Sequence, residues 1–120
     1  MDLDKEIKIL ETNEFKVDIY NQTIEVCDVE KHNHGWDAKT ICDYDKTEKI
    51  TVLFEVETIG SEAIVHESVH IAMFIFERIG INFDTDNHEH FAYLVEYVYS
   101  NLTKIAVEMQ KKYRKDDKVA

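Results

Sequence analysis

The chain is poor in the residues that interrupt or cross-link a small protein. Its 120 residues include no proline, three glycines and two cysteines. Two cysteines are too few for the disulfide scaffold of a small secreted domain, so Cys27 and Cys42 are expected to stay reduced in a cytoplasmic protein. Because no proline-rich or low-complexity stretch marks a linker, a chain of this length predicts a single domain.

Basic residues are also scarce. Lysine and arginine total 14 against 25 aspartates and glutamates, which gives a net charge of −11 at pH 7. Such a polyanion gains nothing from neutralising phosphates, so nucleic-acid binding through a basic face and docking on an anionic membrane are disfavoured. No apolar run approaches the roughly 20 residues that span a bilayer, and the sequence begins without the basic-then-apolar order of a secretion signal. The expected partner, if it is charged, is basic.

The hydrophobic residues, 44% of the chain, follow two patterns. In the first half, short segments are rich in β-branched and aromatic residues, and apolar and polar residues alternate along them, which favours strands. The expected strands are residues 15–20, 23–27, 40–42 and 50–56. Short links, with turns at residues 21–22 and 43–48, predict a mainly antiparallel sheet. Residues 1–14 fit either a frayed helix or a strand.

After residue 56 the hydrophobic period changes to that of a helix. Residues 63–79 are apolar nearly all round, which predicts a helix buried on most sides, with Ser61 as its N-cap and Gly80 as its left-handed stop. A second helix, from about residue 86 to residue 112, carries one apolar stripe. The predicted fold is therefore α+β, a domain of residues 1–112 followed by a charged, flexible tail of residues 113–120.

The motif His66-Glu67-Ser68-Val69-His70 lies inside the first predicted helix. Histidines at positions i and i+4 project from one helical face, so both imidazoles can reach a common point. That point suits Zn²⁺, which binds neutral imidazole, and Glu67 lies where its carboxylate can take a proton from a water molecule. Polar side chains inside so apolar a helix are costly to bury unless a metal, or a backbone carbonyl, satisfies them.

A catalytic zinc site needs a third protein ligand and one open position. Glu89, at the start of the second helix, is expected to supply that ligand, because a short loop between antiparallel helices would return it to the level of the two histidines. The neighbouring His88 and His90 are alternative ligands. Glu89 also fits a capping box with Asp86, in which it only accepts the cap N–H.

Residues 64–70 and 87–93 together resemble the zincin metallopeptidases of the gluzincin type. In that family one helix supplies two histidines and the catalytic glutamate, and a later helix supplies a glutamate ligand. The resemblance implies a hydrolase in which His66, His70 and Glu89 bind Zn²⁺ and Glu67 is the general base. It covers roughly residues 50–99, and more loosely the chain looks like short proteins of bacteriophages and prophages.

The resemblance also implies how a substrate binds. In small zincins the sheet is followed by an active-site helix and a glutamate-bearing helix. The strand before the active-site helix is a sheet edge that pairs with an extended peptide. Here that strand is residues 50–56, so Val52 and Phe54 are expected to contact a peptide or protein substrate.

The chain departs from the family pattern after the glutamate ligand. Many gluzincins place an aspartate one turn later to orient a ligating histidine, and here that position is Tyr93. Glu96 is expected to take the orienting role, since a ligating imidazole normally donates its second N–H to a carboxylate or carbonyl. Tyr93 is expected instead to hydrogen-bond the developing oxyanion.

Other interpretations remain open. His32 and His34 fit either a substrate-side role near the metal or a polar surface loop. Zinc could also serve only to hold the two helices together, without catalysis. The chain could instead be an acidic binding or inhibitor protein without metal, in which the histidines of the motif are satisfied by hydrogen bonds.

Overall fold

The fold is α+β, as the sequence predicts. The computed structural model describes residues 7–31, 35–42, 49–82 and 84–119, with side chains as far as Lys112. These residues form four strands, a short 3₁₀ turn and two long helices. In chain order the elements are β1 (Ile9–Val17), η1 (Asp18–Tyr20), β2 (Gln22–Val29), β3 (Ala38–Cys42), β4 (Lys49–Phe54), α2 (Ser61–Ile79) and α3 (His88–Val119).

The four strands form one mixed sheet in the order β1-β2-β4-β3. β1 is antiparallel to β2, and β3 is antiparallel to β4, but the central strands β2 and β4 run parallel. The prediction of a mainly antiparallel sheet therefore holds for the two outer pairs of strands but not for the central pair, β2 and β4. Short links determine how strands adjacent in sequence pair, whereas here the chain forms β3 at the far edge and then returns to place β4 beside β2.

β4 is a central strand, so the prediction that residues 50–56 form a sheet edge is wrong. It pairs with β2 on one side and with β3 on the other. Ile50, Val52 and Phe54 are alternate residues of β4, and each is 0% exposed, so the face of the strand that they share is fully covered. Val52 and Phe54, which were expected to contact substrate, are therefore core residues. The edge strands of this four-stranded sheet are β1 and β3.

The hairpin between β1 and β2 turns at residues 18–21, slightly before the expected turn at residues 21–22. Residues 9–14 belong to β1, which ends at Val17, because residues 18–20 form the turn η1 instead of extending the strand. Asn21 adopts a left-handed conformation with φ of 51°, and its N–H donates to the carbonyl of Asp18 at 3.1 Å. Asparagine is among the few non-glycine residues that tolerate this conformation. The predicted connection at residues 43–48 lies outside the described residues.

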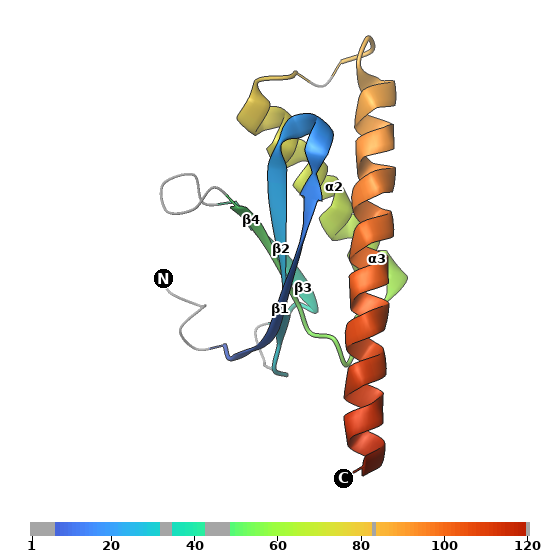
Figure 1. Ribbon diagram of the computed structural model, residues 1–120. Helices are drawn as coiled ribbons and strands as arrows, with labels where there is room; N and C mark the ends of the chain where they lie inside the picture. The colour runs from blue at the N-terminus through green and yellow to red at the C-terminus, as the bar shows by residue number, and fades with distance from the viewer. Residues whose placement is uncertain (1–6, 32–34, 43–48, 83, 120) are drawn as a thin grey trace.

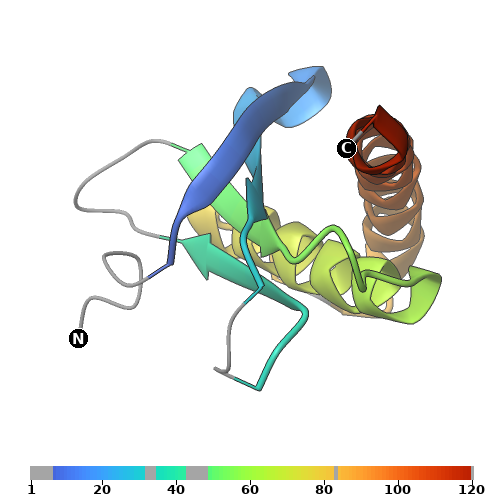
Figure 2. The ribbon, with the colours of Figure 1, turned by 90° about the horizontal axis from the view of Figure 1, so that it is seen from below.

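Both helices lie on the same face of the sheet (Figures 1 and 2). α2 packs on β3 and β4, whereas α3 packs on β1 and β2 and against α2. Phe54, Ile71 and Leu102 are fully buried between the sheet and the helices. A smaller cluster that includes Cys27 and Leu53 forms a second apolar core. The packing thus fixes α2 directly above the β3 edge of the sheet.

The two ends of α2 agree with the sequence only in part. Gly80 is left-handed, with φ of 79°, and its N–H bonds to the carbonyls of Glu77 and Phe76, as expected for a helix stop. At the other end Gly60 is the N-cap and makes no side-chain capping bond. The predicted capping role of Ser61 is wrong, because Ser61 is already the first residue of the helix.

α3 is longer than the sequence predicts. It begins at His88 and continues to Val119, beyond the end expected near residue 112. The buried stripe that anchors it consists of Leu94, Val98, Leu102, Ala106 and Met109. Lysine and arginine are frequent in residues 111–118 and are good helix formers, which favours this extension.

Asp28 gives the first testable prediction. This residue of β2 is 9% exposed, and burial raises the pKa of its carboxyl, with Glu11 adding to the effect and a hydrogen bond from the Val56 backbone opposing it. The folded state therefore holds this proton more tightly than the unfolded state, and stability falls as pH rises from about the ordinary value of 3.8 through the raised pKa. Asp28→Asn is expected to remove this loss and to raise the free energy of unfolding at pH 7.

Urea unfolding of the wild type and Asp28→Asn at several pH values between 4 and 7 measures this effect, with the exposed Glu57→Gln as a control for the change in charge. The amide oxygen of asparagine can still accept the Val56 N–H, so the variant keeps that bond. An Asp28→Asn protein that is less stable than the wild type at pH 7 would contradict the prediction.

Candidate metal centre

His66 and His70 lie side by side on the solvent face of α2. Their Nε2 atoms are 3.1 Å apart, and their ring centroids are 4.8 Å apart at an interplanar angle of 69°. The side chain of His66 is 67% exposed, and His70 is exposed as well. At this separation both Nε2 atoms can bind one cation, or one imidazole can donate a hydrogen bond to the other.

The prediction that α2 is buried on most sides is wrong. Its outer face is exposed and includes three apolar residues, Val65 at 44%, Val69 at 37% and Met73 at 55%. His66 and His70 belong to this face and reach water. Burial therefore gives no reason to place a metal here, and the short distance between the two Nε2 atoms is the observation that remains.

Glu67 is buried, in contrast to the two histidines, with 6% of its surface exposed. Its Oε1 accepts a hydrogen bond from the Thr40 hydroxyl at 2.7 Å, and its Oε2 lies 4.0 Å from Nε2 of His66. Ser68, the other polar residue between the histidines, is fully buried and donates to the Ile64 carbonyl at 2.7 Å. One carboxylate oxygen of Glu67 is thus held by β3, and the other lies near the imidazoles.

No feature of the sequence indicated a role for Thr40. It lies in a segment that the hydrophobic alternation correctly assigns to a strand. However, no pattern along the chain shows which residue of a later helix a strand residue will contact. The hydrogen bond to Glu67 joins residues far apart in sequence and depends on α2 packing over the sheet edge.

The start of α3 is closed by Asp84 and Asn87 instead of by the predicted capping box. Oδ1 of Asp84 accepts the N–H groups of Asp86 at 2.9 Å and of Asn87 at 3.1 Å. The carbonyl of Asn87 accepts the N–H of Phe91 at 3.1 Å, which makes Asn87 the residue that precedes the helix. The predicted box needs Glu89 to accept the Asp86 N–H, which Asp84 already binds. The capping-box interpretation of Glu89 is therefore wrong.

Glu89 lies exposed in the first turn of α3, and not at the level of His66 and His70. The rings of Phe76 and Phe91 are 5.3 Å apart, which sets the position of α3 along α2. Phe76 lies about 9 Å further along α2 than His70. The first turn of α3 therefore packs near the C-terminal end of α2, and the expected return of Glu89 to the histidines is not seen. Ligation by Glu89 stays a prediction.

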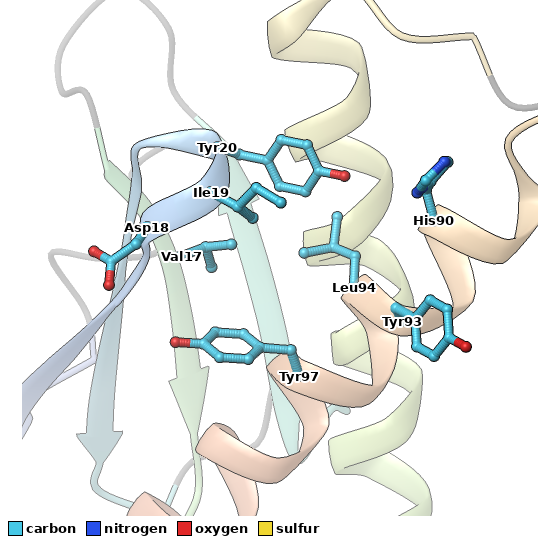
Figure 3. A pocket seen from close by; sticks show the side chains of 8 residues that line it. All are labelled: Val17, Asp18, Ile19, Tyr20, His90, Tyr93, Leu94 and Tyr97. Atoms are coloured by element: carbon cyan, nitrogen blue, oxygen red, sulfur yellow. The ribbon is translucent and has the colours of Figure 1, made fainter.

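His90 and Tyr93 line a separate cavity of about 420 Å³ between α3 and η1. In Figure 3 the side chains of Tyr20, Leu94 and Tyr97 surround the same hollow. Tyr93 is 66% exposed. Both residues thus lie on the side of α3 that faces η1. The roles of His90 as an alternative ligand and of Tyr93 as an oxyanion donor stay predictions.

Glu96 lies on another side of α3. It lines a groove between α3 and α2 together with Glu62 and Val65, the residue before His66. The predicted orienting role of Glu96 stays a prediction.

The described residues contain part of the predicted metal centre. Among residues 7–31, 35–42, 49–82 and 84–112, no three histidine, cysteine, aspartate or glutamate side chains are grouped so as to hold a metal ion. The structure brings His66 and His70 together with Glu67 beside them, and it leaves Glu89 apart. His32 and His34 lie outside the described residues.

Comparison with known proteins adds no family to this picture. No protein-family model, curated protein or solved structure matches the chain. Within the described part of the chain, neither helix combines the length and the apolar character needed to cross a membrane.

Proposed function

We propose that the chain is a small zincin-type peptidase, in which His66 and His70 bind Zn²⁺ and Glu67 is the general base. The observation that carries the proposal is the 3.1 Å separation of the two histidine Nε2 atoms, with an oxygen of Glu67 4.0 Å from one of them. Two imidazoles and a carboxylate in this spacing are the groups that metal-assisted hydrolysis requires.

The donor groups fit Zn²⁺ in part. Neutral imidazole is a preferred ligand, and the two histidines offer a common point on an exposed surface. A third protein ligand is needed, and we propose Glu89, with His88 and His90 as alternatives in the same turn. Because this turn packs near the C-terminal end of α2, the proposal requires the first turn of α3 to move toward His66 and His70 when zinc binds. Because Asp84 binds the N–H groups at the start of α3, Glu89 is not required as a cap.

Glu67 is the residue that moves the proton in this proposal. Bound Zn²⁺ supplies Lewis acidity, which lowers the pKa of a water molecule and polarises a peptide carbonyl. Oε2 of Glu67 accepts the proton from the attacking water, and Glu67 then returns that proton to the leaving amine. The hydroxyl of Thr40 keeps Oε1 in place, so the carboxylate does not need to be oriented when substrate binds.

The substrate strand in this proposal is β3. β3 is an edge strand, α2 packs against it, and its Thr40 contacts Glu67. An extended peptide that adds to the outer edge of β3 by main-chain hydrogen bonds would run alongside the buried general base. This assignment takes the place of residues 50–56, which lie in the centre of the sheet.

Zinc titration and a cleavage assay test the proposal. Isothermal titration of metal-free protein is expected to give one Zn²⁺ per chain, and Glu89→Gln is expected to weaken binding by at least about tenfold. The exposed Glu77→Gln on α2 serves as the control for loss of one carboxylate. A library of internally quenched peptides is expected to be cleaved with zinc and not with chelator.

The outcomes separate the alternatives. Zinc binding without cleavage of any peptide would favour a structural metal that joins the two helices. Failure of the wild-type protein to bind zinc would overturn the proposal and favour the metal-free binding or inhibitor protein. If His88→Ala or His90→Ala weakens binding while Glu89→Gln does not, that histidine is the third ligand.

A further inference from the structure

A groove of about 420 Å³ runs between α2 and α3. Its lining includes Val65 of α2 and Ala92, Val95 and Tyr99 of α3. Val65 is 44% exposed, and Val95 and Tyr99 are half-buried, so the groove presents an apolar surface to solvent. Such a surface can accommodate the aliphatic part of a ligand but does not by itself define its charge.

Two carboxylates give the groove its charge. Glu62 of α2 and Glu96 of α3 both line it and both are exposed, and the described residues that line it include no lysine or arginine. The N-terminus of α2 at Ser61 contributes a partial positive charge of only about half a unit, which two carboxylates outweigh. The net charge of −11 adds a field of the same sign. The groove therefore favours a cation and disfavours an anion.

The groove adjoins the candidate metal centre. Val65 immediately precedes His66. Glu62 lies one helical turn before His66, so Glu62 and His66 share one face of α2. If a peptide substrate placed its scissile bond at His66 and His70, the side chain in the groove would belong to a residue close to that bond. Its apolar surface together with the two carboxylates matches a side chain with a long aliphatic stem and a positively charged end.

We infer that this groove binds a lysine or arginine side chain of a peptide, and that it selects substrates with a basic residue near the scissile bond. The choice of a peptide as the occupant and the selection of substrates for cleavage rest on the proposed function, whereas the preference of the groove for a cationic side chain rests only on its lining residues. The occupant is a peptide, because the groove lies next to the groups proposed to hydrolyse one.

Peptide binding by the Glu67→Gln protein tests this inference without cleavage of the probe. The probes are fluorescein-labelled, terminally blocked alanine pentapeptides with lysine, norleucine or glutamate in the centre, and fluorescence anisotropy measures their Kd. We expect the lysine probe to bind about threefold to tenfold more tightly than norleucine at about 20 mM salt, and the preference to shrink at about 300 mM. The glutamate probe is expected to bind most weakly.

The preference for lysine over norleucine should disappear when Glu62→Gln and Glu96→Gln are added. The matched control is Glu77→Gln with Glu108→Gln, which also removes one exposed carboxylate from each helix but keeps the groove. Amide chemical-shift changes at Val65 and Val95 on addition of the lysine probe are expected to locate the site.

The results of this test are distinct from those of the zinc experiment. Equal binding of the lysine and norleucine probes, no measurable binding of either, or a preference that survives loss of Glu62 and Glu96 would overturn the inference. If the preference is present but the wild-type protein neither binds zinc nor cleaves peptides, the groove assignment stands and the proposed peptidase fails. If the protein cleaves peptides but shows no preference for basic residues, the proposed peptidase stands and the groove assignment fails.

Discussion

Replacing Glu67 by glutamine is expected to lower kcat for peptide hydrolysis by about 10²–10⁴-fold, the usual contribution of a positioned general base. The substitution keeps the size of the side chain, and the amide oxygen of glutamine can still accept the Thr40 hydroxyl that now donates to Oε1 at 2.7 Å. What is lost is the ability to take a proton from water. Initial rates with the best peptide of the library, at saturating zinc, measure the effect.

The same variant must keep its metal and its fold for this loss to be assigned to proton transfer. We expect Glu67→Gln to bind zinc within a few-fold of the wild type and to unfold at a similar urea concentration. Glu57→Gln, an exposed carboxylate in the loop before α2, is expected to retain full activity. Hydrolysis by Glu67→Gln at more than about one tenth of the wild-type rate would remove Glu67 from its proposed role.

Most elements of the fold could be predicted from the sequence, but their arrangement in the sheet could not. Alternation of apolar residues located the strands, and the three- to four-residue period with Gly80 located α2 and its end. Strand order depends on pairing between segments far apart in sequence, such as β2 with β4, and no local pattern reports it. The full burial of Ile50, Val52 and Phe54 is consistent with a central strand, whereas the family resemblance favoured an edge.

Only the part of the candidate site that lies within a single helix could be predicted from the sequence. Helical geometry places residues i and i+4 on one face, so the approach of His66 to His70 follows from the sequence. The exposure of that face and the contact of Glu67 with Thr40 depend on how α2 lies over β3. The level of Glu89 depends on packing of α3 against α2, where the contact of Phe76 with Phe91 sets the position.

Replacing His70 by alanine is expected to weaken zinc binding by at least about 100-fold, since loss even of a group that only orients a ligand typically costs 10–100-fold. His70 is exposed, so its removal leaves no cavity in the core, and the urea midpoint of the metal-free protein is expected to change little. Competition with a zinc-binding dye gives the affinity. Met73→Ala, which alters a neighbouring exposed position on the same helix, is the control.

The alternative to a metal is a hydrogen bond between the two imidazoles at 3.1 Å, and the same variant distinguishes the two. If the pair is only hydrogen-bonded, His70→Ala leaves His66 facing water, which satisfies it, so neither stability nor zinc affinity should change appreciably. If the pair binds zinc, His66→Ala and His70→Ala should give similar losses, and removing both should cost little more than removing either. Unequal losses, with one histidine nearly silent, would mean that the approach of the two Nε2 atoms does not define the metal site.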